Sequence, residues 1–222
     1  EPLMYEMNTT AGSFAGYDVI DTTPQEGITS AVYDWKQFAA TVAIAGIEEI
    51  KNRGESKVLD LLEAKVMQAR MSISDSLNRA LFSDGTGNGS KDFAGLLAYV
   101  PVDPTTGTVG GINRATTGTS WWRNYKDTTA AALTIGQLST AYNSVSKGRD
   151  VPTNAFTTQT LYEKYESLLQ PALRFSDNAT ADAGFQNLLY KQCPVVFDRD
   201  CGSGLFYFLN VKYMSIPKNA TI

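Results

Sequence analysis

The stretch Ser56–Phe82 reads SKVLDLLEAKVMQARMSISDSLNRALF and contains no proline. Its apolar residues recur at steps of three and four, which places them on one stripe of a helix. Gly54 precedes the stretch and Asp84-Gly85 follows it, as is typical of helix boundaries. At about 1.5 Å per residue the helix would be about 40 Å long. We therefore predict one long helix that packs on a core through this stripe: Val58, Leu62, Val66, Ala69, Ile73, Leu77 and Leu81.

The composition limits the class of protein. The chain has 222 residues, enough for one large domain or two small ones, and 43% of them are hydrophobic. The formal net charge is −4, without a run of like charges. Proteins that coat phosphates concentrate Lys and Arg on one face, so the charge argues against that class but permits a protein that encloses nucleic acid. The polar residues of Ser56–Phe82 argue against a membrane span.

The sequence contains no histidine, which restricts catalysis and metal binding. Ser-His and Cys-His pairs are excluded, and so is the commonest metal ligand. Cys193 and Cys201 flank PVVFDRD, which we expect in a hairpin, and two thiols alone do not complete a four-ligand zinc site. A disulfide is geometrically possible, but we expect two buried free thiols. No metal and no cofactor is predicted.

The first residues, EPLMYEMNTT, have no initiator Met and neither the basic nor the apolar region of a signal peptide. The last residues, IPKNATI, follow closely on a predicted strand. We expect that the protein has a further N-terminal segment and a further C-terminal segment.

Residues 17–44 predict an extended two-stranded arm. YDVID (17–21) has the composition of a short strand, TTPQEG (22–27) that of a turn, and ITSAVYDWKQFAATVAI (28–44) that of a long strand. A lone two-stranded hairpin is marginally stable in water. We therefore expect either the rest of the chain or a neighbouring subunit to cover it.

The middle of the chain is rich in glycine and turn residues. GIEEIKNR (46–53) predicts a short helix. The glycines that follow the long helix suggest a phosphate loop or a calcium loop. A phosphate loop, however, lies between a strand and a helix N-terminus, whereas these glycines follow a helix C-terminus, and a calcium loop needs spaced carboxylates and a terminal Glu that are missing here. We expect a plain tight connection there. Trp121 and Trp122 follow a turn-rich excursion, and we expect them in the core, with an interface position as the alternative.

Helices and strands alternate from Thr134 onward. TIGQLSTAYNSVSKG (134–148) predicts a helix with Thr134 as its N-cap and Gly148 at its end. A strand within VPTNAFTTQ and a helix from TLYEKYESLLQPAL follow, whereas FQNLLYKQ is ambiguous. PVVFD (194–198) and LFYFLNVKYMSI (205–216) predict paired strands around DCGSG. This α/β region is expected to begin near residues 127–133.

In this order, the segments resemble the major capsid proteins of tailed bacteriophages, whose Hong Kong 97-like fold encapsulins share. None of the segments is a catalytic motif, so the specificity of the resemblance lies in their number and order. Together they cover most of the chain. They are SAVYDWKQFAATVAIAGIEEIKNRGESKVLDLLEAKV, LFSDGTGNGSKDFAGLLAYV, GGINRATTGTSWWRN and PVVFDRDCGSGLFYFLNVKYMSI.

The resemblance implies an α+β fold in three parts. Residues 1–45 would be an extended loop, a β-hairpin arm that reaches over an adjacent subunit. Residues 46–129 would be a peripheral domain that includes the long spine helix, 56–82. Residues 130–222 would be the α/β axial domain, which clusters around fivefold and sixfold axes. On this resemblance, we expect the family's N-terminal arm and its C-terminal peripheral segment to be missing from the chain.

The resemblance also implies a structural, non-enzymatic function. Hexamers and pentamers would form an icosahedral shell that encloses a double-stranded DNA genome without sequence-specific binding. The protein would assemble in the host cytoplasm and reside in the virion, without membrane association and with a scaffold, portal or decoration proteins as possible partners. Because exposed apolar residues on a hairpin need cover, we predict four subunit-interface residues: Tyr17, Val19, Trp35 and Phe38.

Three alternatives remain open. An encapsulin-type nanocompartment shell would have the same fold and a protein cargo. An enzyme could pair a Ser or Thr nucleophile with a Lys base, or use two carboxylates. A secreted adhesin or carbohydrate-binding module would fit the middle rich in Thr, Ser and Gly, but not the long helix. The carboxylates that such an enzyme could use are expected in strand ends and turns, where acidic side chains are usually solvated. They are Asp18, Asp21, Asp34, Asp198 and Asp200.

Overall fold

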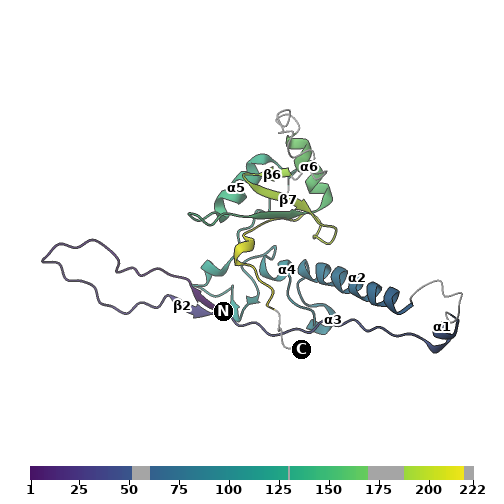
Figure 1. Cartoon of the computed structure of the whole chain (residues 1–222). Coiled ribbons are helices and arrows are strands. Elements are labelled where there is room, and N and C mark those ends of the chain that lie inside the picture. The colour runs from purple at the N-terminus through teal and green to yellow at the C-terminus, as the bar shows by residue number, and fades with distance from the viewer. Residues whose placement is uncertain (52–60, 130, 170–187, 218–222) are drawn as a thin grey trace.

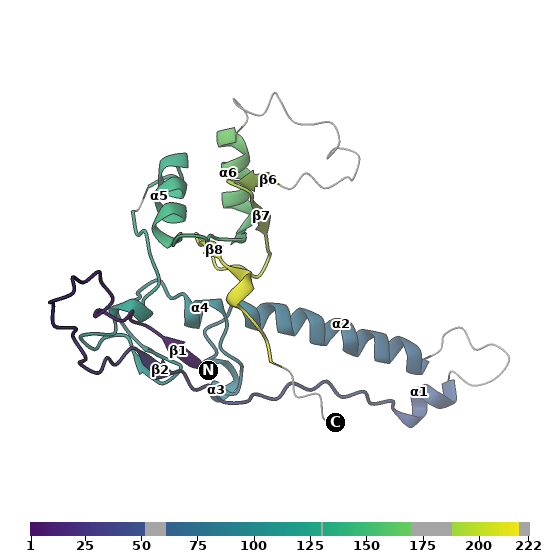
Figure 2. The same cartoon turned by 60° about the vertical axis from the view of Figure 1, so that its left-hand side comes forward.

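The computed structural model of the chain describes residues 1–51, 61–129, 131–169 and 188–217. Figure 1 shows three parts: a body built around a sheet, a long helix that extends from its base, and a loop that projects in the opposite direction. Figure 2 shows the same arrangement after a turn of 60°. The chain is therefore a mixed α and β structure, as the alternating patterns predict.

The sheet body contains four strands in the order β6-β7-β5-β8. β5 pairs with β7 in parallel and with β8 in antiparallel orientation, whereas β6 and β7 are antiparallel. Helices α5 and α6 lie on one face of the sheet (Figure 2). The strands and helices are β5 (Asn154–Thr157), β6 (Leu188–Tyr190), β7 (Cys193–Phe197), β8 (Phe206–Leu209), α5 (Ile135–Val145) and α6 (Gln159–Leu169).

The predicted pairing of the last two strands is wrong. β7 and β8 exist where the sequence predicts strands, but β5 lies between them. The connection from residue 198 to residue 205 is long enough to cross one strand, since neighbouring strands lie only about 4.8 Å apart. Ala155 on β5 is fully buried, which suits a central strand. The ambiguous segment FQNLLYKQ contains the edge strand β6 within its described residues.

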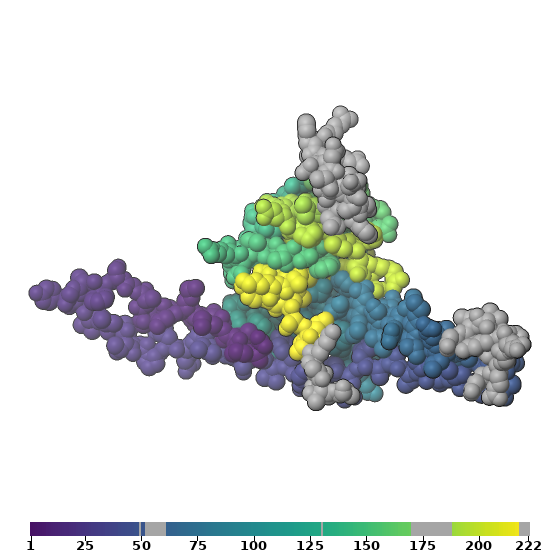
Figure 3. Space-filling model, in the orientation of Figure 1, coloured from purple at the N-terminus to yellow at the C-terminus, as the bar shows by residue number. Residues whose placement is uncertain are grey.

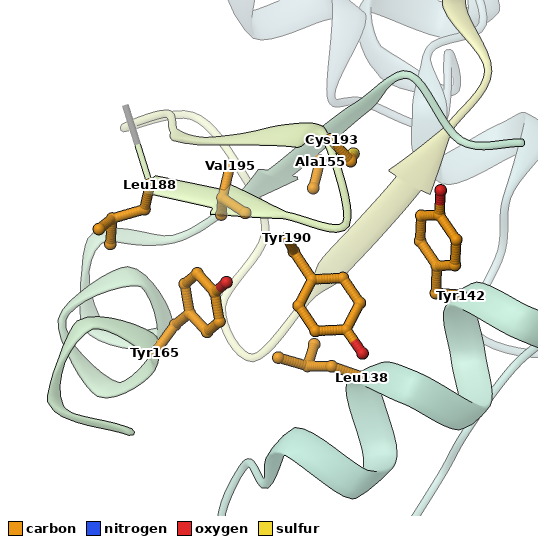
Figure 4. Packing of buried hydrophobic residues seen from close by; sticks show 8 residues of the cluster. All are labelled: Leu138, Tyr142, Ala155, Tyr165, Leu188, Tyr190, Cys193 and Val195. Carbon is orange, nitrogen blue, oxygen red and sulfur yellow. The ribbon is translucent and has the colours of Figure 1, made fainter. Parts of the chain in front are cut away.

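Side chains of the sheet point alternately to two apolar cores. Phe206 and Phe208 pack beneath α5 and α6, whereas Tyr207 and Leu209 point to the opposite face. This period of two is that of a strand with both faces covered. Figure 4 shows the larger core on the helix side, which consists of Leu138, Tyr142, Ala155, Tyr165, Leu188, Tyr190, Cys193 and Val195.

The N-cap of α5 is confirmed. Thr134 Oγ1 accepts a hydrogen bond from the Gln137 backbone N–H at 3.2 Å, and Gln137 Oε1 accepts one from the Thr134 N–H at 2.9 Å. This reciprocal pair is a capping box. The helix ends at Val145, three residues before Gly148, which instead supports a turn with a φ of +61°.

The long helix α2 spans Leu61–Leu81, which confirms that part of the predicted helix. Residues 56–60 lie outside the described residues, and Phe82 lies just beyond the helix. The expected packing on a core is wrong for most of its length, because Ala80 is its only described buried residue. Leu62 is 58% exposed although it belongs to the predicted stripe. The reason is that α2 extends away from the sheet body (Figure 1).

The chain before α2 has less regular structure than its composition suggests. Among the described residues of this region, only β1 (Pro2–Met4) and β2 (Ile28–Ser30) pair as strands, in antiparallel register. Residues 17–21 form no strand, and the strand predicted over 28–44 ends at residue 30. Beyond β2 the chain runs unpaired along the lower side of α2 to the short helix α1 (Gly46–Lys51), as Figures 1 and 2 both show.

Short elements connect α2 to the sheet body. They are α3 (Gly87–Ser90), α4 (Leu96–Tyr99), the hairpin β3 (Thr108–Val109) and β4 (Ile112–Asn113), and the 3-10 helix Ser120–Trp122. Position 85 requires glycine for two reasons: its φ is +76°, and a Cβ there would lie 2.9 Å from the Ala94 Cα. The glycine-rich segment is thus the tight connection that its sequence predicts.

Candidate assembly surfaces

The protruding loop, residues 5–27, extends away from the rest of the described chain (Figure 3). Tyr5 joins its two limbs at the base: the backbone N–H donates to the Gly27 carbonyl at 2.9 Å and the hydroxyl donates to the Glu26 carbonyl at 3.0 Å. Every residue from 11 to 26 is exposed. The loop has no apolar core of its own, so its apolar side chains are available to another surface.

The tip of this loop is a preformed turn. The Asp18 backbone N–H donates to the Ala15 carbonyl at 2.9 Å, and the Asp18 carboxylate accepts the Ala15 N–H at 2.8 Å. Two of the predicted interface residues lie beside this turn, Tyr17 at 103% and Val19 at 96% exposure. The local hydrogen bonds thus hold the turn while its apolar side chains face solvent.

The other two predicted interface residues lie elsewhere. Trp35 and Phe38 belong to the extended segment 31–45 below α2, and they are 70% and 43% exposed. Phe38 is partly covered by Phe93, with ring centroids 6.2 Å apart. The four predicted residues therefore form two separate surfaces and not one site.

A third surface, on α2, was missed from the sequence. Met67 and Met71 are 63% and 66% exposed, and Leu77 and Leu81 are each more than one-third exposed. These side chains lie on a face that the predicted core stripe only partly includes. The sequence did contain an indication of this surface. A helix that packs through one side needs apolar residues on one face, but α2 has them on more than one face.

Two tryptophans anchor the base of the loop. Trp121 stacks on Tyr5 with ring centroids 4.8 Å apart, and Trp122 Nε1 donates to the Val109 carbonyl at 3.0 Å. Val32, just after β2, donates its N–H to the Gly110 carbonyl at 3.0 Å. Both tryptophans are half-buried, so they serve as packing anchors at the loop base and do not belong to the main core.

Arg114 is the central polar residue of this base. Only 4% of it is exposed, and its guanidinium donates to the Trp122 carbonyl at 3.1 Å and to the Tyr99 carbonyl at 2.6 Å. Burial lowers the pKa of Arg114 from its ordinary value. The side chain thus fastens α4 to the 3-10 helix, a role that spacing in the sequence does not reveal.

A polar contact joins α2 to the sheet body. Asn78 on α2 donates through Nδ2 to Asp198 at 3.0 Å and to Asp200 at 2.8 Å. Both carboxylates follow β7, so one amide group spans the two parts of the molecule. Of the five carboxylates considered as catalytic candidates, these two converge, and they serve as acceptors for Asn78.

An ion pair lies beside this contact. Asp75 on α2 accepts hydrogen bonds from Arg79 on the same helix and from Arg199 after β7, the latter at 2.6 Å. These two bonds, that from Arg79 foremost, lower the pKa of the Asp75 carboxyl. The group therefore stays ionised well into the acidic range and adds to the attachment of α2.

The structure also places one Ser-Lys pair together. Lys191 Nζ lies 3.4 Å from Ser139 Oγ but only 2.9 Å from Asn143 Oδ1. The same nitrogen lies over the Tyr142 ring, 5.1 Å from its centroid. The lysine nitrogen thus contacts an amide oxygen and a ring face of α5, and these contacts join the turn between β6 and β7 to that helix.

Both cysteines are free and buried, which confirms the expectation from the sequence. Burial raises the pKa of each thiol to about 11, so both are protonated at neutral pH. The described residues contain no cluster of three acidic or cysteine side chains able to hold a metal ion. None of the described helices is both long enough and apolar enough to span a membrane.

Comparison with known proteins finds a likeness to a solved structure. No protein-family model matches the chain, and no curated protein sequence does. A chain of the capsid asymmetric unit of cyanophage A-1(L) is similar, with a TM-score of 0.66 and 21% sequence identity. The similarity covers 96% of the present chain and 65% of the cyanophage chain. At this identity the likeness concerns the fold: the chain has a fold that is found in a phage capsid.

Proposed function

We propose that this chain is a major capsid protein of a tailed bacteriophage, with the Hong Kong 97-like fold, and that it self-assembles into an icosahedral shell around a double-stranded DNA genome. The observation that carries the proposal is the likeness of nearly the whole chain to a cyanophage capsid chain. The loop and α2 support it, since both have apolar side chains that a single subunit leaves uncovered.

In this proposal each part of the chain has a place in the capsid subunit. Residues 1–45 form the extended loop and residues 46–129 form the peripheral domain, with α2 as the described part of a spine helix over 56–82. Residues 130–222 form the axial domain. The separate apolar core beneath α5 and α6 supports an axial unit that folds around its own centre.

The proposed subunit is structural and not catalytic. It forms hexamers and pentamers through contacts that include Tyr17, Val19, Trp35 and Phe38, all of them exposed in the single chain. The net charge of −4 suits a wall that encloses DNA without gripping it. Assembly takes place in the host cytoplasm, with a scaffold, portal or decoration proteins as possible partners, and the product is the virion.

Electron microscopy and light scattering of the purified full-length protein test this proposal. Uniform closed particles, or pentamers and hexamers, are the expected result. A stable monomer at every concentration, also after co-expression with neighbouring phage genes, would contradict it. The cargo of particles purified from their natural source separates the two shell functions: double-stranded DNA supports a phage capsid, whereas a protein cargo would indicate an encapsulin-type nanocompartment.

A further inference from the structure

Asn88 and Gly89 form the one Asn-Gly pair of the sequence, and they lie in α3, in the connection that follows α2. Both residues are exposed, and their φ angles of +51° and +67° depart from helical geometry. Neither the Asn88 side chain nor the Gly89 N–H has a hydrogen-bond partner among the described residues. The fold therefore leaves this dipeptide open to water and free of local restraint.

An asparagine side chain can react with the backbone that follows it. The nitrogen of the next residue attacks the side-chain carbon Cγ and loses its proton to solvent, so that a new N–Cγ bond closes a five-membered succinimide ring. The Cγ–Nδ2 bond breaks, and the nitrogen leaves as ammonia. Water then opens the ring at either carbonyl, which yields aspartate or isoaspartate. Water is the only co-reactant.

Glycine at position 89 favours this reaction in two ways. It has no Cβ to crowd the attacking nitrogen, and its backbone is free to rotate toward the Asn88 side chain. The surroundings do not oppose this movement, since even a Cβ built on Gly89 would meet no atom within 4 Å. Gly85 in the same connection differs, because a Cβ there would lie 2.9 Å from the Ala94 Cα.

Other asparagines of the chain are held by hydrogen bonds and precede larger residues. Asn113 Oδ1 accepts from the Ala115 N–H at 2.9 Å, and Asn143 Oδ1 accepts from Lys191 Nζ at 2.9 Å. A side chain held in this way must first release its partner before its Cγ can meet the backbone nitrogen. Exposure, free hydrogen-bonding groups and a following glycine thus combine at Asn88.

We infer that Asn88 is a site of spontaneous deamidation in the folded protein. The reaction adds one negative charge to each copy, and where isoaspartate forms it adds one carbon to the backbone of the connection after α2. Ser90, two residues further on, accepts a hydrogen bond from Lys36 Nζ at 2.7 Å. The change therefore occurs beside a point that attaches segment 31–45 to the connection. The inference does not depend on the proposed shell function.

Mass spectrometry of the folded, full-length protein after incubation at mildly alkaline pH tests the inference. Trypsin cleavage after Arg79, Lys91 and Arg114 gives peptides 80–91 and 92–114, and each contains a single Asn and no Gln. The conversion of Asn88 and that of Asn113 are therefore read separately within one sample. Asn88 should be converted at least about tenfold faster than Asn113, with both aspartate and isoaspartate as products.

The same incubation of urea-unfolded protein separates the effect of the fold from that of the dipeptide. The folded and unfolded chains should convert Asn88 at rates within about tenfold of each other, because the fold leaves Gly89 free to rotate. An unconverted peptide 80–91 in the folded protein, or one converted no faster than peptide 92–114, would overturn the inference.

Two variants test the proposed chemistry. Asn88→Gln would need a six-membered ring, and it should lower the conversion rate at least about tenfold without changing the melting temperature, since the side chain is exposed. Gly89→Ala adds the Cβ that crowds the attacking nitrogen and should also slow the reaction. Conversion of both variants at the rate of the unchanged protein would overturn the inference. No particles are needed for these measurements, so their outcome is independent of the shell proposal.

Discussion

Tyr165 and Tyr17 belong to the same chain but differ as much in exposure as two tyrosines can, at 0% and 103%. Tyr165 lies in the core of the sheet body, where its hydroxyl donates to the Leu189 carbonyl at 2.9 Å. Tyr17 lies at the tip of the loop without a covering side chain. The sheet body buries its apolar residues within the chain, whereas the loop and α2 leave several of theirs exposed.

The largest expected effect is a loss of stability of the sheet body. Tyr165→Ala removes a fully buried ring and its hydrogen bond, so we expect the free energy of unfolding to fall by about 3–5 kcal/mol. Urea denaturation of the unassembled subunit measures this loss. Tyr17→Ala is the control and should change stability by less than about 0.5 kcal/mol. Similar losses in the two variants would remove the contrast between the two regions.

The next effect concerns assembly and not folding. Trp35→Ala should raise the concentration needed for assembly about tenfold, equivalent to about 1.4 kcal/mol per contact, because exposed aromatic anchors often dominate interfaces. Light scattering against protein concentration gives this value, and calorimetry should find the unassembled subunit unchanged. An equal loss of subunit stability would mean that Trp35 packs within its own chain.

A smaller effect is expected at the start of α5. Thr134→Ala removes the side-chain half of the capping box and should lower the free energy of unfolding by about 1 kcal/mol. Thr134→Ser retains the hydroxyl and should restore most of the loss. Urea denaturation of the unassembled subunit is again the measurement. If Thr134→Ala unfolds at the same urea concentration as the unchanged protein, the cap does not stabilise the sheet body.

The smallest effect is a pH dependence at the junction between α2 and the sheet body. The pKa of Asp75 is lowered from its ordinary value of 3.8, so its contribution to stability is present above that pH and is lost as pH falls through the lower folded value. Asp75→Asn should therefore flatten the stability profile below about pH 4 and lower stability slightly at neutral pH. Melting temperatures across pH 2–7 measure this dependence. The same fall in melting temperature below about pH 4 in Asp75→Asn and in the unchanged protein would contradict the prediction.

Local features were predictable because their causes lie close together in sequence. The Thr134 cap depends on Gln137, three residues away, and the helical period of α2 is visible in a single window. Cys193 and Cys201 were predicted to be free because two cysteines in a chain of this size neither resemble a disulfide scaffold nor complete a zinc site. All four proposed interface residues are exposed, but Tyr17 and Val19 lie on the protruding loop and Trp35 and Phe38 on the extended segment below α2, so the predicted hairpin does not explain their exposure.

Features that depend on distant contacts were not predictable. The position of β5 between β7 and β8 is decided by which strands share a common core, and the composition of each strand fits several orders. The contact of Asn78 with Asp198 joins residues that are 120 positions apart. The burial of Arg114 depends on carbonyls at residues 99 and 122, and a lone arginine in a turn-rich segment gives no sign of it.

The sequence by itself determined several elements: the long helix, the capped helix after Thr134 and most strands of the sheet body. These follow from periodicity, capping and turn chemistry, which act over a few residues. Only the tertiary structure decided which apolar faces are covered. α2 has the amphipathic pattern of a packed helix, yet it extends beyond the sheet body and keeps an open face, because burial depends on what lies beside a helix in space.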